Sequence, residues 1–408
     1  MKHPLTAVFL YIIFLAACSK QSGQATGGTT SDSATVTVLN GYGSGQYKVG
    51  DTVDIWSNAI AADSVFNEWT GDNNLLFNAG EWHSNFIMPR TNITLTSTCS
   101  YLAPFTLKYE KIKGVSNLKN VYYYFPSSQK GIVYLCHGTG GDAQNLVNNF
   151  EWREMINDLV FAGFAIVVTE AEEVTLNTDL DGDGKIHWML LPADTTANVD
   201  YANIAALTDS FYARGYTQPS VPRYSIGMSN GGIFSSALSF IFRYAAGVSF
   251  CAPTGTLVTS NSITPLLFCM AQYDNAPEVG ATGNALAQNN ASALTARGIC
   301  SPLYLHNHSP AYPQRWARWN GISLSLSEAI FGELALNHLL DARNYLVLTA
   351  DSIEARITAS PSHYPVISSL NLSQYTFVTN EIDIMYAAHQ FFSDYNKTTI
   401  HFLEAPCR

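Results

Sequence analysis

A serine set among glycines is the residue whose surroundings point most directly to chemistry. Ser229 lies in the stretch RYSIGMSNGGIF, with Gly227 before it and Gly231 and Gly232 after it. The G-x-S-x-G match gains weight from its context, because an apolar strand-like run precedes it and a helical run follows it. A strand, a tight turn and a helix form the setting in which a strained serine projects its hydroxyl as a nucleophile, and the glycines clear the space for that turn. The alternative is an ordinary strand–helix turn with a capping serine.

A second pattern, DLDGDGKIHW, carries metal-binding chemistry. Its carboxylates stand at alternating positions: Asp179, Asp181 and Asp183. Oxygen ligands at this spacing, followed by Gly184 for the turn, are typical of the front of a calcium loop. The twelfth position is Leu190 instead of a bidentate glutamate, so a complete site needs another acid such as Asp194. Two interpretations stay open, a structural calcium site and a solvated acidic turn, and no cofactor is predicted to be required for catalysis.

From about residue 105 the sequence alternates strands with amphipathic helices. A hairpin is predicted over 105–126, and helices over 152–163 and 203–215. The predicted strands that follow the hairpin are short and apolar: 131–138, 163–171, 222–227, 247–253, 265–274 and 381–389. This alternation predicts an α/β protein with a mostly parallel sheet covered by helices, and ligands bind such sheets at the carboxyl ends of the strands.

The region from about residue 105 to 408 resembles the α/β-hydrolase superfamily. The SNGG run at the serine and the HGTGG run at 137–141 are most similar to secreted esterases of the feruloyl-esterase and polyhydroxybutyrate-depolymerase kind. The resemblance implies an α/β-hydrolase fold and a catalytic triad whose members follow the chain order serine, acid, histidine.

Asp274 ends the second predicted strand after the serine, which is where the acid of such a triad belongs. A solvated loop aspartate is the other interpretation of this residue. His389 closes the apolar run IDIMYAA, which we predict to be a strand, and a final helix follows it. His306 and His308 are the alternative bases, but a strand, a histidine and a closing helix near the C-terminus are typical of hydrolases. We therefore predict Ser229, Asp274 and His389 as the triad.

Catalysis by such a triad also needs backbone N–H groups aimed at the developing oxyanion. One is predicted to be the amide of Asn230, directly after the nucleophile. The second is predicted to come from the loop after the strand GIVYLC, with the amide of Thr139 as the candidate. His137 in the same loop is predicted to pack and form hydrogen bonds instead of serving as a base.

Two further segments flank the hydrolase region of 104–408. Residues 34–103 alternate apolar and polar side chains with turn residues between, and resemble one copy of the small all-β repeat modules of bacterial surface proteins. We interpret this domain as a spacer or packing unit in preference to a glycan- or partner-binding one. Between the acid and the histidine, a helical insertion is predicted around 301–380, where Ser325-x-x-Glu328 has the form of a capping box. It either covers the active site as a lid or buttresses the sheet.

The N-terminus predicts export and anchoring. Residues 1–17 have the polar start and short apolar run of a signal peptide, and Leu15-Ala16-Ala17-Cys18 resembles a bacterial lipobox, which implies lipid attachment to Cys18. An ordinary signal peptide is the alternative. Residues 18–33 are polar and rich in Gly, Ser and Thr, as in a flexible tether. Because Ser19 is not the aspartate that commonly retains lipoproteins in the inner membrane, we favour the bacterial outer membrane, facing either the periplasm or the outside.

The composition excludes nucleic acid as a binding partner. The net charge of −11 with only 21 Lys and Arg gives no basic surface for nucleic acid. The predicted compartment permits disulfides, and Cys300 and Cys407 could pair, whereas Cys136, Cys251 and Cys269 fall in apolar runs where buried free thiols are equally expected. The sequence thus predicts a lipid-anchored serine hydrolase that cleaves carboxylic esters through an acyl-enzyme. A peptidase of the same fold and a non-catalytic, ligand-binding surface lipoprotein are the alternatives.

Overall fold

The computed structural model describes residues 32–276, 279 and 282–407. The predicted signal peptide over 1–17, the lipid-anchoring Cys18 and nearly all of the tether over 18–33 therefore lie outside the described residues. Among the described residues, no helix combines the length and apolar character needed to cross a bilayer.

The largest element of the fold is an eight-stranded sheet with the order β15-β14-β13-β12-β10-β11-β9-β8. The six strands from β15 to β11 run parallel, and β9 and β8 are antiparallel to their neighbours. Its strands are β8 (Lys108–Lys113), β9 (Leu118–Tyr124), β10 (Ile132–Cys136), β11 (Ala165–Val168), β12 (Arg223–Met228), β13 (Ala246–Phe250), β14 (Leu266–Ala271) and β15 (Leu303–His306). The predicted hairpin and the predicted parallel sheet are both present, and the architecture is that of an α/β-hydrolase.

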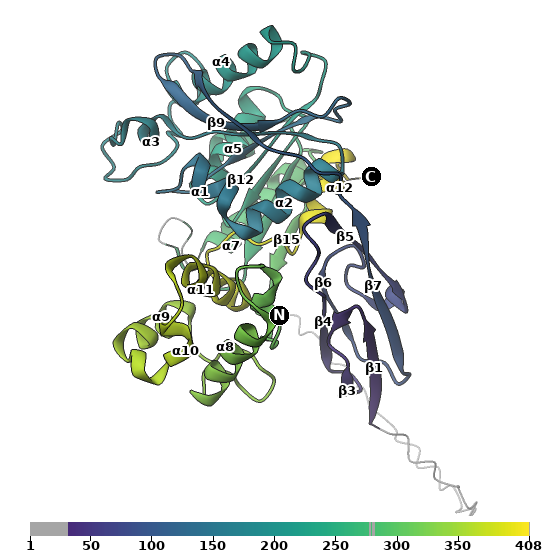
Figure 1. The fold of residues 1–408 in the computed structure, drawn as a ribbon. Helices are drawn as coiled ribbons and strands as arrows, with labels where there is room; N and C mark the ends of the chain where they lie inside the picture. Colours follow the sequence, from purple (N-terminus) through teal and green to yellow (C-terminus); the bar gives the residue numbers. More distant parts are fainter. Residues whose placement is uncertain (1–31, 277–278, 280–281, 408) are drawn as a thin grey trace, which may run out of the picture.

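Helices cover both faces of this sheet (Figure 1). Val133 and Leu135 point to one face, where they pack with α1 (Ala143–Asn148), α2 (Phe150–Phe161) and α12 (Asn396–Glu404). Ile132 and Tyr134 point to the other face, which is covered by α4 (Val199–Ala213), α5 (Asn230–Ile241), α6 (Thr256–Asn261) and α7 (Gly283–Ala296). A short α3 (Glu172–Leu176) follows β11. Burial on both faces explains why the parallel strands are uniformly apolar in sequence.

Residues 33–101 form two small sheets with an apolar core of their own. One has the order β3-β1-β7-β5 and the other β2-β4-β6. The strands are β1 (Ser33–Leu39), β2 (Gly41–Tyr42), β3 (Gly45–Lys48), β4 (Thr52–Ser57), β5 (Ser64–Gly71), β6 (His83–Ile87) and β7 (Ile93–Tyr101), with a short η1 (Asn73–Leu75). Trp69 is fully buried, and its indole N–H donates to the carbonyl of Glu81 at 2.9 Å. We refer to this unit as the β module.

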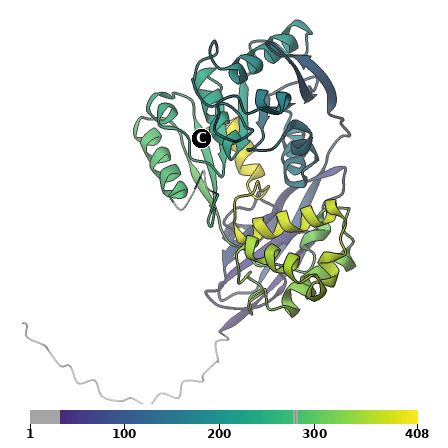
Figure 2. The same cartoon turned by 90° about the vertical axis from the view of Figure 1, so that its left-hand side faces the viewer.

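The chain between β15 and the C-terminal helix forms a helical segment (Figure 2). Its elements are η2 (Arg315–Arg318), α8 (Leu324–Leu336), α9 (Ala350–Ala359), η3 (Pro361–His363), α10 (Pro365–Ser368) and α11 (Leu372–Tyr386). They enclose a separate core that includes Trp316, Ile330, Ile353 and Ile382. The capping residue of α8 is Ser323, whose side chain accepts from the Leu326 amide, and not Ser325 of the predicted capping box.

The predicted strand over 381–389 is wrong, because this stretch is the end of α11 and the loop after it. Asn371 and Gln374 form a capping box that starts the helix ten residues before the apolar run. Phe377, Glu381 and Ile384 then recur at helical spacing and are buried. The short run IDIMYAA, taken alone, suits either structure, and the upstream cap selects the helix.

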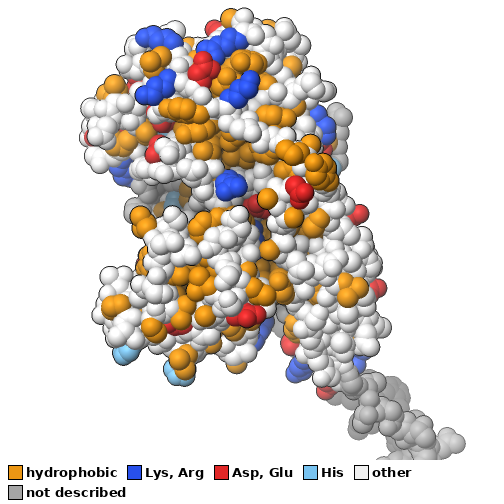
Figure 3. Space-filling model, viewed as in Figure 1, with side chains coloured by type: hydrophobic (Ala, Val, Ile, Leu, Met, Phe, Trp, Pro, Cys, Tyr) orange, Lys and Arg blue, Asp and Glu red, His pale blue; other side chains and the backbone are white. Residues whose placement is uncertain are grey.

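Buried charges join the helical segment to the other two units. The Arg318 guanidinium lies 2.8 Å from a Glu151 carboxylate oxygen on α2 and 3.3 Å from Glu381 on α11. It also stacks on the ring of Trp82 in the β module at 3.7 Å. Figure 3 shows apolar side chains gathered in a band across the upper part of the molecule, which holds the eight-stranded sheet, and in further patches over the helical segment below it. The three units therefore pack as one body.

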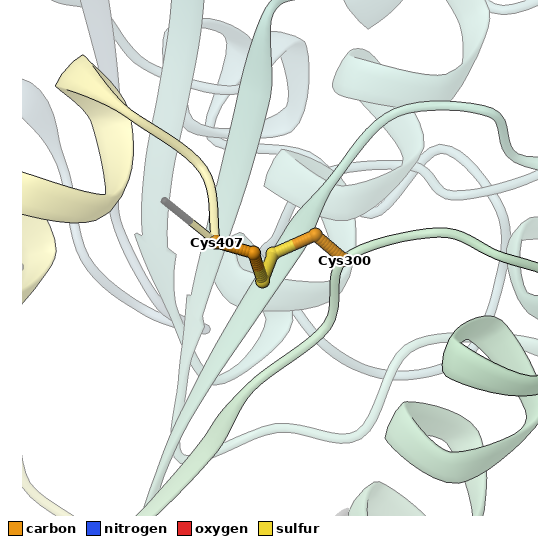
Figure 4. Close-up of a disulfide and its surroundings, with 2 residues drawn as sticks. All are labelled: Cys300 and Cys407. Atoms are coloured by element: carbon orange, nitrogen blue, oxygen red, sulfur yellow. A yellow bond between two sulfur atoms is a disulfide. The ribbon is translucent and has the colours of Figure 1, made fainter.

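A disulfide between Cys300 and Cys407 fastens the end of the chain to the loop before β15 (Figure 4). By contrast, Cys136, Cys251 and Cys269 are buried and free. Burial raises the pKa of each of these thiols, so they behave as small apolar side chains.

Candidate active site

Ser229 sits at the junction of β12 and α5 in a backbone conformation that side chains rarely adopt, with φ 59° and ψ −128°. Its amide donates to the Phe250 carbonyl on the neighbouring strand at 2.9 Å. A Cβ on Gly227 would lie 1.9 Å from the Gly231 carbonyl oxygen, and a Cβ on Gly231 would lie 2.2 Å from the His137 carbonyl oxygen. Both positions therefore require glycine, and the strained turn holds the serine at the carboxyl end of the sheet.

The structure brings Ser229, His389 and Asp274 together in one chain of hydrogen bonds. His389 Nε2 lies 2.9 Å from Ser229 Oγ, and His389 Nδ1 lies 2.8 Å from Asp274 Oδ2. The Asp274 side chain is fully buried, whereas 19% of the His389 side chain is exposed. A buried carboxylate on one ring nitrogen and a hydroxyl on the other form the arrangement that lets an imidazole take up the hydroxyl proton.

Two backbone features place His389 although it follows a helix and not a strand. Ala387 adopts a left-handed conformation, with φ 58°, and turns the chain out of α11. Its carbonyl accepts from the Tyr273 amide at 2.8 Å, which ties the histidine loop to the end of β14, next to Asp274.

The alternative bases lie elsewhere. His306 ends β15 and is buried against Phe392, with its Nε2 2.8 Å from the Ile384 carbonyl oxygen. Burial lowers the pKa of His306. His308 is half-buried among Tyr273, Tyr345 and Tyr386. Within the described residues, neither ring bonds to Ser229.

The two predicted oxyanion donors belong to loops on either side of the serine. Asn230 is the first residue of α5, and Thr139 follows Gly138, where an added Cβ would lie 3.3 Å from the Ser229 Cβ. Among the described residues, neither the Thr139 amide nor the Asn230 amide donates to a protein acceptor. Two unpaired N–H groups beside a nucleophile are available to a developing negative charge.

The side chain of Asn230 has a supporting role that the sequence did not reveal. Its Oδ1 accepts from the Trp188 amide at 2.9 Å, and its Nδ2 donates to the Trp188 carbonyl at 3.1 Å. The Trp188 indole N–H donates to the His137 carbonyl at 3.0 Å, and the Gly140 amide donates to the Ile186 carbonyl at 2.9 Å. The end of the acidic pattern, at Ile186 and Trp188, thus braces both oxyanion loops. A polar residue buried at a helix start needs partners, and that is the one signal that could have found it.

The His137 side chain stabilises the loop after β10 that carries Thr139. The ring is buried, its Nε2 accepts from the Ala171 amide at 3.2 Å, and its Nδ1 lies 2.7 Å from the Gly138 carbonyl oxygen. These partners require a proton on Nδ1 and none on Nε2. Burial lowers the pKa of His137 to about 4, which keeps the ring neutral. The residue acts as a hydrogen-bonding support.

The acidic pattern forms a loop organised around carboxylates. Asp179 accepts from the Gly182 and Gly184 amides at 2.6 and 2.7 Å, and Asp183 Oδ2 lies 2.9 Å from His187 Nε2. Asp194 does not join it, since its carboxylate accepts from Thr196 and Ala197. Glu173 lies closer, with oxygen ligands within 4.8 Å of those of Asp179 and Asp181. These oxygens suit a calcium ion, and the calcium site stays a prediction.

Comparison with known proteins gives likenesses at the level of structure only. No family model and no curated protein matches the chain. Similar solved structures include an α/β serine hydrolase, XC6422, from Xanthomonas campestris, at 13% identity and a TM-score of 0.36 over 52% of this chain and 88% of that one. A dienelactone hydrolase from Anabaena variabilis has 17% identity and a TM-score of 0.38 over 50% and 88%. Est1E from Butyrivibrio proteoclasticus, solved with ferulic acid, has 12% identity and a TM-score of 0.35 over 50% and 90%. Likenesses this distant say nothing of what the chain acts on.

Proposed function

We propose that this protein is a serine hydrolase that cleaves carboxylic esters through an acyl-enzyme on Ser229. The observation that carries the proposal is the unbroken chain from Ser229 Oγ through both ring nitrogens of His389 to the buried Asp274. The unpaired amides of Thr139 and Asn230 beside the serine add to it. An intact triad also argues against the alternative of a surface protein whose hydrolase domain only holds a ligand.

In the proposed mechanism, His389 Nε2 removes the hydroxyl proton as Ser229 Oγ attacks the acyl carbon. The amides of Thr139 and Asn230 donate to the oxyanion that forms, and Asp274 stabilises the imidazolium. Collapse of the intermediate breaks the ester C–O bond while His389 returns the proton to the leaving alkoxide. Water then attacks the acyl-enzyme with the same histidine as base, which releases the acid and restores the serine.

Labelling with a fluorophosphonate probe tests this proposal, using protein without residues 1–18 and mapping the adduct by mass spectrometry. We expect modification of Ser229 alone, its loss in Ser229→Ala, and a decrease of about 10³-fold or more in His389→Ala. A folded protein that no probe labels would sink the proposal. Matched ester and amide substrates then separate an esterase from the peptidase alternative, since an esterase turns over only the ester at a useful rate.

We also propose that the mature chain begins at Cys18 and is lipid-anchored to the bacterial outer membrane. The lipobox-like Leu15–Cys18 and the polar tether after it support this proposal. Mass spectrometry of the N-terminal peptide tests it. We expect a lipid mass on Cys18 and none in Cys18→Ala, and an unmodified peptide beginning elsewhere would contradict it.

A further inference from the structure

A groove of about 590 Å³ lies between the β module and the helical segment. One wall is formed by Tyr42, Tyr47 and Trp56 of the β module, and the other by the connecting stretches 310–314 and 342–345. The Ala311 amide donates to the Asn344 carbonyl at 2.9 Å, which joins these two stretches into one surface. The volume falls within the range of about 300–1,000 Å³ that is typical of small-molecule sites.

Aromatic rings line both walls of the groove. Tyr312 stacks on Trp56, with ring centroids 4.4 Å apart, and lies 5.4 Å from the ring of Tyr42. Tyr42, Tyr47 and Tyr345 are half-buried, so each presents part of a ring to the space between the walls. Such rings offer flat, apolar faces to the C–H groups of a ligand.

The same walls carry polar groups without partners. The side chains of Asp51, Gln314 and Asn344 line the groove and form no hydrogen bond within the described part of the chain. Asp51 and Asn344 are exposed and Gln314 is half-buried, so their polar groups are open to a ligand in the groove.

These features together select one kind of ligand. A purely apolar ligand would leave the polar groups of Asp51, Gln314 and Asn344 without a partner. An anion would meet Asp51 and Asp54, with Arg343 as the one cation in the lining. A pyranose presents C–H faces for the rings and hydroxyl groups that both donate and accept. We propose that this groove binds a neutral saccharide chain.

Aromatic side chains connect the groove with the catalytic residues. Tyr345 in the groove contacts His308 with a centroid distance of 5.0 Å, and His308 contacts Tyr386 at 5.2 Å. Tyr386 contacts Tyr273 at 5.1 Å, and Tyr273 directly precedes Asp274. A saccharide in the groove thus lies on a path of rings that leads to the triad. Its binding does not depend on the proposed esterase activity.

Calorimetric titration of the full-length protein in detergent tests the site, with cellohexaose, xylohexaose and mannohexaose as probes. The Ser229→Ala variant is used throughout, so that binding is read without any turnover. We expect at least one hexasaccharide to bind, and Tyr42→Ala and Tyr345→Ala each to weaken that binding about tenfold. Tyr101→Ala is the matched control, because Tyr101 is an exposed tyrosine of the β module outside the groove, and it leaves the affinity unchanged.

Further variants and a control ligand distinguish saccharide binding from unfolding and from non-specific adsorption. If Tyr42→Ala lowers the unfolding midpoint, Tyr345→Ala on the opposite wall and Asp51→Asn at an exposed position carry the test. Polyethylene glycol of matched length, which lacks hydroxyl groups along its chain, must fail to bind. The absence of binding by all three hexasaccharides at millimolar concentration, equal affinity in both tyrosine variants, or equal binding of the glycol would each overturn the proposal. Failure of Ser229 labelling in the wild type would leave it standing.

Discussion

The serine and the histidine of the site are held in opposite ways. Ser229 is positioned by residues close to it. The strained turn lies between β12 and α5, where Gly227 and Gly231 allow close packing, and the Ser229 amide bonds to Phe250 on the adjacent strand. His389 sits on a loop after α11, and its support comes from far along the chain. The Ser393 amide in that loop donates to Glu151 at 2.7 Å, and Arg318 bonds both residues.

The β module extends this distant support. Asp394, five residues after the histidine, lies 2.7 Å from His83 Nδ1 of β6, and the carboxylate of Glu81 accepts from the Thr398 amide at 2.7 Å. The position of Ser229 therefore depends on contacts within the domain that holds the eight-stranded sheet. The base depends on the packing of the helical segment and the β module against that sheet. Substitutions in the two regions are expected to fail differently.

The largest effect is expected from Gly231→Ala. The new Cβ would lie 2.2 Å from the His137 carbonyl oxygen and 2.4 Å from the Cys136 carbonyl oxygen, so the turn and the oxyanion loop must separate. We expect loss of soluble protein, or a loss of Ser229 labelling of more than about 100-fold. Gly332→Ala is the control, since nothing lies within 4 Å of its added Cβ and alanine favours helix α8. Normal labelling in Gly231→Ala would show that the turn is not set by close packing.

Arg318→Met tests the distant support of the histidine. The substitution leaves the carboxylates of Glu151 and Glu381 buried without this partner, which costs about 3–5 kcal/mol of unfolding free energy. We expect a lower unfolding midpoint in calorimetry and slower labelling of Ser229 below that midpoint, because the loop with Ser393 loses a contact. Arg343→Met, at an exposed arginine, provides the comparison. If Arg318→Met melts and is labelled like this control, the buried charges do not support the loop that carries His389.

The same contrast explains how much the sequence could predict. The setting of Ser229 is local, so strand, glycines and helix could be read from a dozen residues, and Asp274 followed from its place after the second strand. His389 was selected because it stood between a predicted strand and a closing helix near the C-terminus. The strand was wrong, because the decisive cap lies at Asn371 and starts a helix. The ion network and the groove join residues up to some 300 positions apart, and no local pattern encodes such contacts.

Asn230→Ala tests whether the side chain of Asn230 supports the oxyanion loops beside Ser229. The backbone amide that we propose as an oxyanion donor remains, but Trp188 loses both hydrogen bonds to the Asn230 side chain. We expect a decrease in kcat of about 10- to 100-fold, equivalent to about 1–3 kcal/mol, with little change in KM. The pH dependence of the remaining activity is expected to be unchanged, because the histidine is untouched. A wild-type kcat would mean that the Trp188 segment does not hold the oxyanion loop.

The smallest expected effect is a pH dependence of stability that arises at His83. Burial alone would lower the pKa of this ring, but hydrogen bonds to Asp394 and then Asp54 outweigh burial, and its pKa is raised. Both ring nitrogens face carboxylates, so the folded protein holds the imidazolium. The associated stability is complete below the ordinary histidine pKa of about 6.5 and is lost as the pH rises through the raised value. Urea titrations of the wild type between pH 6 and 9 are expected to show this loss, and those of His83→Gln a flatter profile. Parallel profiles would assign the dependence to other groups. Ser229 labelling that is the same in both proteins at each pH would show that His83 does not contribute to the support of the histidine loop.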